Sequence, residues 1–295
     1  MREEVVNFVF FICFFFFVRN TTTAIFQYLG RPPENHFSRG SGNPLKMARK
    51  IVVIFDFDRT LIDDDSDRWV ISGMGLTHLF NQLRPILPWT SLMDRMVEEL
   101  HSQGRTIEDI VECLNGVPLH QRTAAAIKSA HAFGCDLKVV SDANKFYIET
   151  ILKHHGLYDC FSEIITNPTT VNEQGRLQIF PYNDLASPHD CNLCPPNICK
   201  GLVIKRFQAS IAPFAETKFI YLGDGNGDFC PVLKLGIADY VMPRKNFPLW
   251  ERINSNPGLV EAEVHEWCNG EELEHILLEL IETISSEDIK TDIYE

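Results

Sequence analysis

Hydrophobic positions along the chain alternate between short continuous runs and helix-like spacing. The first run, residues 51–55, is five apolar residues that are mostly β-branched, which predicts a strand buried on both faces of a parallel sheet. Further strand patterns lie at residues 136–142, 161–166, 217–222 and 238–242, and helical patterns at 123–133, 144–155 and from Lys200 onward. This alternation predicts an α/β fold built on a doubly wound parallel sheet.

The segment after the first strand departs from that alternation. Between Trp69 and Gly116 the apolar residues recur at helical spacing and no strand pattern occurs. We therefore predict a small helical cap, residues 67–117, inserted after the first strand, with Asp67 or Ser66 as the N-cap of its first helix. The predicted catalytic core is 47–66 and 118–270, with a hairpin at 169–181, followed by a C-terminal helix and acidic tail at 271–295.

The N-terminal region is predicted to be an extension outside the fold. Residues 5–18 are almost continuously apolar, but 14 residues are too few to span a bilayer comfortably. Glu3 and Glu4 stand where a signal peptide has basic residues, and no clear cleavage site follows. Residues 20–46 have the composition of a linker, so we expect the fold to begin near Met47, with 1–46 disordered or not native. Targeting or anchoring is the alternative for this region.

Composition narrows the classes of partner and compartment. The 295-residue chain carries a net charge of −13, which excludes a general affinity for nucleic acid but allows a small phosphorylated substrate at a site with its own cations. No stable membrane association is expected for the core. The nine cysteines are odd in number and mostly scattered, which favours a reducing compartment, here the cytoplasm.

Polar residues follow the predicted strands at the edge where open α/β sheets bind ligands. Asp56 and Asp58 follow the first strand, Ser141 ends the second, and Asp224 and Asp228 follow a later one, while Lys200 begins a helix. A carboxylate can attack a phosphate only if a divalent cation and a lysine offset their repulsion. We expect Mg²⁺ to bind Asp56, Asp224 and the backbone carbonyl of Asp58, with Lys200 and Ser141 holding phosphoryl oxygens.

These residues lie in four ordered motifs: 56–60 (Asp-Phe-Asp-Arg-Thr), 140–141 (Val-Ser), Lys200, and 223–228 (Gly-Asp-Gly-Asn-Gly-Asp). Together they resemble the haloacid dehalogenase-like (HAD) hydrolases over about residues 50–270. The resemblance implies that Asp56 is the nucleophile of an aspartyl-phosphate phosphatase and that Asp58 is its general acid and base. It also implies that Asp228 supports the metal or its waters, and it places Thr60 and Gly223 at the substrate.

Further strings, such as 65–67 (Asp-Ser-Asp) and 194–201 (Cys-Pro-Pro-Asn-Ile-Cys-Lys-Gly), resemble the phosphoethanolamine/phosphocholine phosphatase subfamily, and among it the plant branch of thiamine phosphate phosphatase-like and pyrophosphatase-like proteins. The resemblance implies that Asp67 and Asp142 face a cationic head group, as in thiamine monophosphate, phosphocholine or phosphoethanolamine. The alternative for these two is an N-cap and an Asx turn. Inorganic pyrophosphate, the alternative substrate, has no cation and would gain nothing from them.

Cys191, Cys194 and Cys199 form a cluster with His189 beside it. Four such ligands could hold a tetrahedral zinc ion, but a compact loop of buried thiols is the simpler interpretation, and a redox role is a third. Two functions of other classes stay open. One is a phosphate-accepting regulatory module without turnover, and the other is a zinc-held interaction module built on this cluster.

Overall fold

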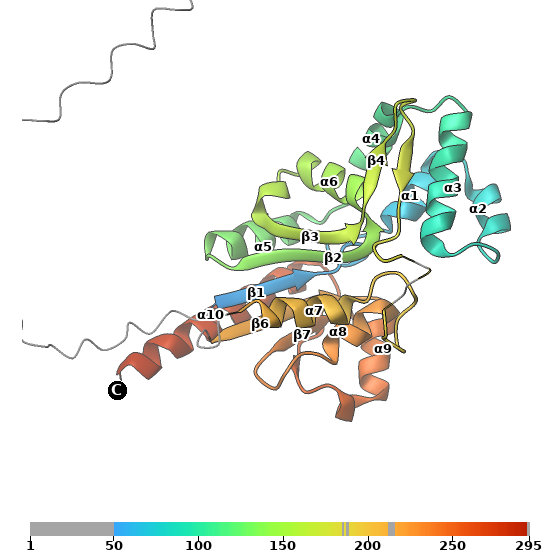
Figure 1. The fold of residues 1–295 in the computed structure, drawn as a ribbon. Helices are drawn as coiled ribbons and strands as arrows, with labels where there is room; N and C mark the ends of the chain where they lie inside the picture. Colours follow the sequence, from blue (N-terminus) through green and yellow to red (C-terminus); the bar gives the residue numbers. More distant parts are fainter. Residues whose placement is uncertain (1–49, 185, 187–188, 212–215, 294–295) are drawn as a thin grey trace, which may run out of the picture. The chain divides into compact units, whose positions relative to one another are not determined.

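The computed structural model describes residues 50–184, 186, 189–211 and 216–293, with side chains from 287 onward left undescribed. The described residues all fall within one compact unit (Figure 1). The predicted extension 1–46 lies outside the described residues. Within the described part of the chain, no helix combines the length and apolar character needed to cross a membrane.

A six-stranded sheet in the order β3-β2-β1-β6-β7-β8 forms the centre, and every neighbouring pair is parallel. The strands are β1 (Lys50–Phe55), β2 (Asp136–Asn144), β3 (Phe161–Asn167), β6 (Thr217–Gly223), β7 (Tyr240–Pro243) and β8 (Glu263–Val264). The chain builds outward from β1 to β3 and then returns to β6 on the other side of β1. The strand order therefore reverses at β1 and β6, where such sheets bind ligands.

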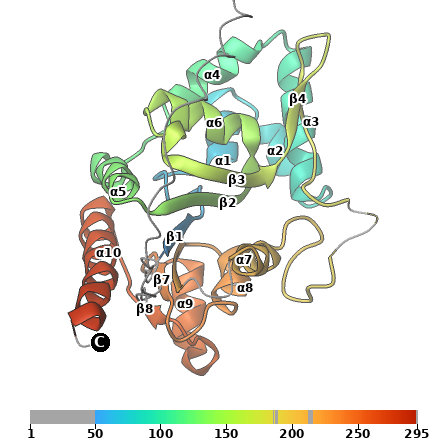
Figure 2. The same ribbon diagram turned by 60° about the vertical axis from the view of Figure 1, so that its left-hand side comes forward.

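Helices cover both faces of the sheet (Figure 2). One face carries α5 (Gln121–Ala132), α6 (Lys145–His154) and α10 (Gly270–Ile293), and the other carries α7 (Lys200–Ala209), α8 (Phe229–Val232) and α9 (Pro248–Ser255). Along β1, Val53 and Phe55 belong to the first core and Val52 and Ile54 to the second. This two-sided burial explains the continuous apolar run, and the predicted doubly wound parallel sheet is confirmed.

Four helices lie between β1 and α5 and are called the helical insert: α1 (Ser66–Gly73), α2 (Thr77–Leu83), α3 (Trp89–Ser102) and α4 (Ile107–Asn115). The N-cap of α1 is Asp65, whose side chain accepts from the backbone N–H of Arg68, so the expected caps Asp67 and Ser66 are wrong. The predicted hairpin is present as β4 (Thr169–Val171) and β5 (Leu177–Ile179). It is joined to the helical insert because Asp94 of α3 pairs with Arg176 at 2.9 Å.

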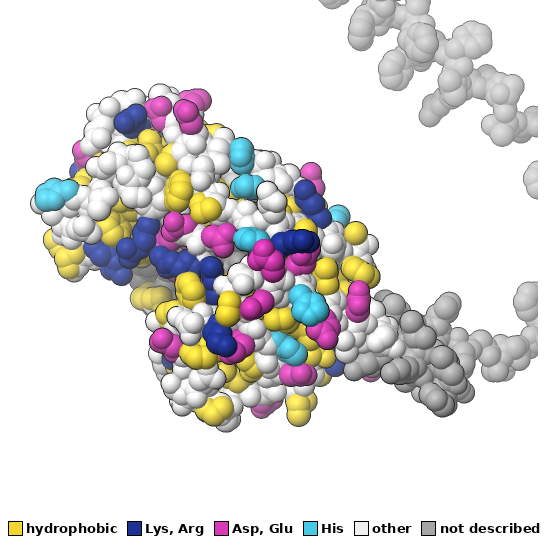
Figure 3. Space-filling view, turned by 180° about the vertical axis from the view of Figure 1, so that it is seen from behind, with side chains coloured by type: hydrophobic (Ala, Val, Ile, Leu, Met, Phe, Trp, Pro, Cys, Tyr) yellow, Lys and Arg dark blue, Asp and Glu magenta, His cyan; other side chains and the backbone are white. Residues whose placement is uncertain are grey.

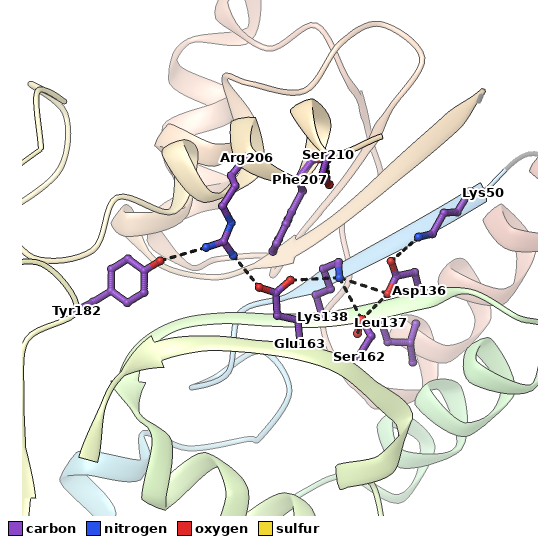
Figure 4. Close-up of polar contacts among 10 residues, drawn as sticks. All are labelled: Lys50, Asp136, Leu137, Lys138, Ser162, Glu163, Tyr182, Arg206, Phe207 and Ser210. Carbon is purple, nitrogen blue, oxygen red and sulfur yellow. Dashed lines mark hydrogen bonds and ion pairs between the residues drawn. The ribbon is translucent and has the colours of Figure 1, made fainter. Parts of the chain in front are cut away.

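A charge network crosses the amino end of the sheet to α7 (Figure 4). Its members are Lys50, Asp136, Lys138, Glu163 and Arg206. Lys50 pairs with Asp136 at 2.8 Å, Lys138 reaches Asp136 and Glu163 at 3.4 Å, and Arg206 pairs with Glu163 at 2.8 Å. Each anion of the network thus has two cationic neighbours.

Candidate active site

Asp56 follows β1 at the point where the strand order reverses. Its backbone N–H donates to the carbonyl of Leu222 at 2.9 Å, which ties it to β6. Its side chain is buried, and Oδ1 accepts from the N–H of Phe57 and from Lys200 Nζ, both at 2.7 Å. Burial, together with Asp228, Asp224 and Asp142, raises the pKa of Asp56 well above its usual range despite Lys200. Oδ2 is left without a donor among the described residues.

Lys200 is the first residue of α7 and is only 4% exposed. Its ammonium lies between Asp56 Oδ1 at 2.7 Å and Asp228 Oδ1 at 2.8 Å. Burial alone would lower the pKa of Lys200, but Asp228, Asp56 and Asp142 outweigh it and raise the pKa well above the usual value. Lys200 is therefore a fixed cation among carboxylates.

Asp228 is held by four donors. Oδ1 accepts from Lys200 Nζ and from the hydroxyl of Tyr221 at 2.6 Å, and Oδ2 accepts from the backbone N–H groups of Asp224 at 3.1 Å and Gly225 at 2.9 Å. Burial favours its protonation, but Lys200 and these hydrogen bonds prevail and lower the pKa of Asp228. With both oxygens engaged, Asp228 is suited to position Lys200 and the loop that carries Asp224.

Gly223 and Thr60 contact the same carboxylates. A Cβ on Gly223 would lie 2.6 Å from Cγ of Asp228, so only glycine permits this packing. Thr60 is buried, and its hydroxyl donates to Asp224 Oδ1 at 3.3 Å. These contacts fix Asp224 and Asp228, and the expected place of Thr60 and Gly223 at the substrate stays a prediction.

Carboxylate oxygens of Asp56, Asp224 and Asp228 lie within 4.8 Å of one another and form what we call the carboxylate cluster. Burial and the nearby Asp228 raise the pKa of Asp224 to about 7. Ionising Asp224 next to the other carboxylates therefore costs free energy. Oxygen ligands of an octahedral Mg²⁺ are about 3–4 Å apart, given bonds of about 2.1 Å. The cluster fits such an ion, with Asp56 and Asp224 better placed as direct ligands than Asp228.

Asp58 follows β1 two residues after Asp56, and Ser141 lies in β2 directly before Asp142. Asp58 Oδ1 accepts from the N–H of Ser66 at 2.8 Å, which links the loop after β1 to the start of the helical insert. Burial, Asp65 and Asp67 raise the pKa of Asp58 well above its usual range and favour its protonated form. Ser141 is fully buried in β2, and its Oγ accepts from the N–H of Ala143 at 3.2 Å, so its own proton can be donated elsewhere.

Asp67 lies in a pocket between the helical insert and the ends of β2 and β3. Its carboxylate accepts from Trp89 Nε1 at 2.8 Å and from Asn144 Nδ2 at 3.4 Å, and burial and the nearby Asp65 raise its pKa to about 8. The pocket lining also includes Thr90, Met93, Asp142, Ala143, Asn167 and Ile179. Asp67 and the exposed Asp142 therefore line the same pocket, and their contact with a cationic head group stays a prediction.

Sequence reasoning missed three polar residues of this region. Asn144 caps α6 and donates to Asp67. Asn167 donates to the carbonyls of Asp142 and Ala143 at 2.7 and 2.8 Å and so fixes the end of β2. Tyr221 holds Asp228 from inside β6. The available signal for the two asparagines was their position at the ends of β2 and β3, but asparagine also caps helices for structural reasons. Tyr221 lies within β6, where a buried aromatic residue gives no such signal.

The predicted soft-ligand cluster is assembled differently from expectation. The sulfur atoms of Cys191, Cys194 and Cys199 gather with that of Cys230, and all four lie within 4.8 Å of one another. His189 is not part of this group: its Nε2 lies 2.9 Å from the carbonyl of Pro195, and its Nδ1 accepts from the N–H of Cys191. The expected ligand His189 is therefore replaced by Cys230, which follows Asp228 by two residues.

The sequence profile of the family described as "Putative Phosphatase" matches residues 51–281, which includes every residue of the carboxylate cluster. The chain belongs to this phosphatase family. The Thiamine phosphate phosphatase-like protein of Arabidopsis thaliana is 58% identical over 241 residues, covering 81% of this chain and 98% of that protein. Inorganic pyrophosphatase 2 of the same plant is 57% identical over 238 residues, covering 80% and 85%. The predicted resemblance to the plant branch is confirmed.

A solved structure of a substrate-bound phosphoserine phosphatase complex shares the fold of this phosphatase-family chain. It has a TM-score of 0.50 at 15% identity and covers 77% of this chain and 98% of the other. The expected HAD-like arrangement of the sheet is thereby confirmed, and the phosphatase prediction is confirmed at the level of the family.

Proposed function

We propose that this chain is a Mg²⁺-dependent phosphatase that hydrolyses small phosphomonoesters through an aspartyl-phosphate on Asp56. The observation that carries the proposal is the buried Asp56, with Oδ1 fixed by Phe57 and Lys200 and Oδ2 free to attack phosphorus. A carboxylate held in one orientation beside a fixed cation is prepared for nucleophilic attack on a phosphoryl group.

Mg²⁺ would be held by Asp56 and Asp224, and when bound it would offset negative charge on the phosphoryl oxygens. Lys200 would bind one of these oxygens while staying paired with Asp228, and Ser141 would donate its hydroxyl proton to another. Thr60 and Tyr221 keep Asp224 and Asp228 in place. The carboxylate cluster then works without rearrangement, which lowers the barrier.

Asp58 would move the proton in both halves of the reaction. Its raised pKa keeps it protonated before attack, so it can protonate the leaving oxygen as Asp56 Oδ2 bonds to phosphorus. As a carboxylate it would then take a proton from the water that cleaves the aspartyl-phosphate, which restores Asp56 and releases phosphate. The N–H of Ser66 couples Asp58 to the helical insert, in line with a cap role for the insert.

The buried carboxyl of Asp67 supports a substrate with a cationic head group, with thiamine monophosphate, phosphocholine and phosphoethanolamine as candidates. The side chains around Asp67 close on one another in this structure and would have to part to admit the head group. A buried carboxylate with a pKa of about 8 gains most from a cation, because the cation replaces missing solvation. Trp89 is not an open aromatic cage, since Arg84 and Arg68 lie 5.1 and 5.9 Å from its ring. Recognition would rest on Asp67 and Asp142.

Inorganic pyrophosphate is the second candidate. The pyrophosphatases of A. thaliana are nearly as similar to this chain as the thiamine phosphate phosphatase-like protein. A protonated Asp67 would not repel a second phosphate, and Lys and Arg side chains gather in a band on one side of the face shown in Figure 3, although the chain is acidic overall. Local positive charge of this kind attracts anions.

The compartment proposed is the cytoplasm. All eight cysteines of the described residues are free thiols, including pairs close enough to react, which suits a reducing environment.

Phosphate release by the full chain tests the function. The substrates are thiamine monophosphate, phosphocholine, phosphoethanolamine, pyrophosphate and an aryl phosphate, each with Mg²⁺ and with chelator. We expect Mg²⁺-dependent turnover, with loss of about 10⁴-fold or more in Asp56→Asn and an unchanged fold by circular dichroism. Substantial activity in Asp56→Asn would refute the mechanism. Stable phosphorylation without turnover would favour the regulatory-module alternative.

A further inference from the structure

Four cysteine side chains from two separate segments meet behind the carboxylate cluster, and we call them the thiol cluster. Cys191, Cys194 and Cys199 come from the loop that ends at α7, and Cys230 comes from α8. Helices α7 and α8 lie side by side in Figure 2. Cys199 and Cys230 are buried, and the other two are partly buried.

The spacing of the sulfur atoms is that of a metal site rather than of a disulfide. Cys230 Sγ lies 3.6 Å from Cys191 Sγ and 3.7 Å from Cys199 Sγ. Four thiolates bound to zinc at about 2.3 Å in a tetrahedron are about 3.8 Å apart. A disulfide requires about 2.05 Å. Two of the sulfur pairs therefore already lie near the separation that zinc imposes.

We propose that Cys191, Cys194, Cys199 and Cys230 form a closed tetrahedral site for a structural zinc ion. On binding, each thiol forms a sulfur–zinc bond and releases its proton to solvent. With all four coordination positions taken by protein ligands, none is left for a substrate, so the ion would stabilise the fold rather than take part in catalysis.

The residues around the thiol cluster allow helix α7 to pass close to Cys230 and stabilise negative charge on the sulfur atoms. A Cβ on Gly201 would lie 2.5 Å from Cys230 Sγ, so glycine is needed where α7 passes this sulfur. Cys199 is the N-cap of the ten-residue helix α7, where the helix dipole favours an anion. Lys205 and Lys234 line the same cavity as Cys230 and offset the net −2 of zinc with four thiolates.

The zinc site would fix the catalytic cation against its partner. Cys199 directly precedes Lys200, and Cys230 follows Asp228 by two residues. A single ion would thus join the segments that carry the two ends of the 2.8 Å Lys200–Asp228 pair. Groups that orient active-site ligands in this way typically affect activity by about 10–100-fold.

Zinc content of the purified full chain tests the proposal. The chain is expressed with zinc, freed of loosely bound metal by gel filtration with a weak chelator, and analysed by mass spectrometry of the elements. We expect one zinc per chain in the wild type and near-complete loss in Cys230→Ser and Cys194→Ser. Cys135→Ser, a buried thiol elsewhere, and Asp224→Asn, in the carboxylate cluster, are expected to keep the zinc. Since Asp224→Asn tests an inactive chain, failure of the proposed function leaves this measurement standing.

If the serine variants fold poorly, cobalt replaces zinc in the wild type. Cobalt(II) in a tetrahedral thiolate site gives intense sulfur-to-metal absorption, and in an oxygen site it does not. The proposal would be overturned by a wild-type chain without zinc whose four thiols react freely, by a disulfide between any two of them, by full zinc content in Cys230→Ser, or by a cobalt spectrum without thiolate bands.

Discussion

The two ends of the sheet carry charge in opposite ways. At the amino end, the charge network of Lys50, Asp136, Lys138, Glu163 and Arg206 alternates in sign, and several of its members are substantially exposed (Figure 4). At the carboxyl end, the carboxylate cluster is buried, and Lys200 is the cation within hydrogen-bonding distance of two of its three members. Positive and negative charges are matched at the amino end, which we call the balanced end. Carboxylates outnumber cations at the carboxyl end, which we call the unbalanced end.

The pKa values express this difference. At the amino end burial acts to raise the pKa of Asp136, but hydrogen bonds from Lys50 and Ser162 and the charge of Lys138 outweigh it and lower the pKa. At the carboxyl end burial and neighbouring carboxylates raise the pKa of Asp56 and Asp224. A fold that only needed stability would gain nothing from such a cluster, so the excess negative charge indicates a site that a cation completes.

The largest effect is expected from removing the cation at the unbalanced end. Lys200→Met leaves Asp56 and Asp228 buried without their partner, which costs about 3–5 kcal/mol of folding free energy. It also removes a donor to the phosphoryl oxygens, which lowers kcat by about 10²–10³-fold. Steady-state kinetics and urea unfolding measure both.

Arg206→Met is the matched control, because Arg206 lies in the last turn of the same helix and pairs with Glu163 at the balanced end. We expect unchanged kcat and a stability loss below about 1 kcal/mol. Equal effects in the two variants would show that the two ends do not differ as described.

Much of the fold follows from the sequence because its signals are local. The apolar run of β1 and the periodicity of the helical insert predict their own structures. The two-residue strand β8 escaped prediction, since Glu263 and Val264 are exposed and carry no strand pattern. The N-cap Asp65 stands among several acidic residues, and which of them accepts the Arg68 N–H depends on where α1 begins.

The candidate site could be predicted only as far as its motifs reach. Asp56, Asp58, Lys200 and Asp224 lie at ordered positions that the motifs mark, but the roles of Thr60 and Gly223 depend on packing against Asp224 and Asp228. Cys230 has no cysteine near it in sequence, so its place beside Cys199 follows only from the contact of α7 with α8.

The next largest effect is expected in the pH dependence of substrate binding near Asp67. Burial raises the pKa of Asp67 to about 8, so the carboxyl is mostly protonated at pH 6 and ionised at pH 9. A cationic head group binds the ionised form, and KM for such a substrate should fall by up to about 50-fold between pH 6 and pH 8. The carboxyl groups of Asp58, Asp65 and Asp142 also face Asp67, so the comparison with Asp67→Asn isolates the part that Asp67 contributes.

KM measured against pH for thiamine monophosphate and for pyrophosphate checks this expectation. Asp67→Asn should abolish the fall for the cationic substrate, while titration of the substrate phosphate stays the same in both proteins. A fall that persists in Asp67→Asn, or one of equal size for pyrophosphate, would remove Asp67 from head-group recognition.

A smaller effect is expected at Tyr221, which supports the unbalanced end without touching Asp56. Tyr221→Phe removes the 2.6 Å hydrogen bond to Asp228 but leaves Lys200 and both backbone donors in place. We expect a stability loss of about 1.5–3 kcal/mol and a decrease in kcat of about tenfold. A decrease as large as that of Lys200→Met would mean that the hydroxyl takes part in the chemistry.

The smallest effect is expected at the balanced end, in Lys50→Met. Lys50 is 54% exposed in its side chain, so its 2.8 Å pair with Asp136 is screened and contributes below about 1 kcal/mol at neutral pH, with kcat unchanged. Because the folded-state pKa of Asp136 is lowered, this contribution is present above its ordinary pKa of about 3.9 and is lost as the pH falls through the lowered value. Urea unfolding of both proteins at pH 7 and in acid should therefore show a small difference that disappears in acid. The absence of any difference at pH 7 would mean that Asp136 stabilises the amino end through Ser162 and Lys138 rather than through Lys50.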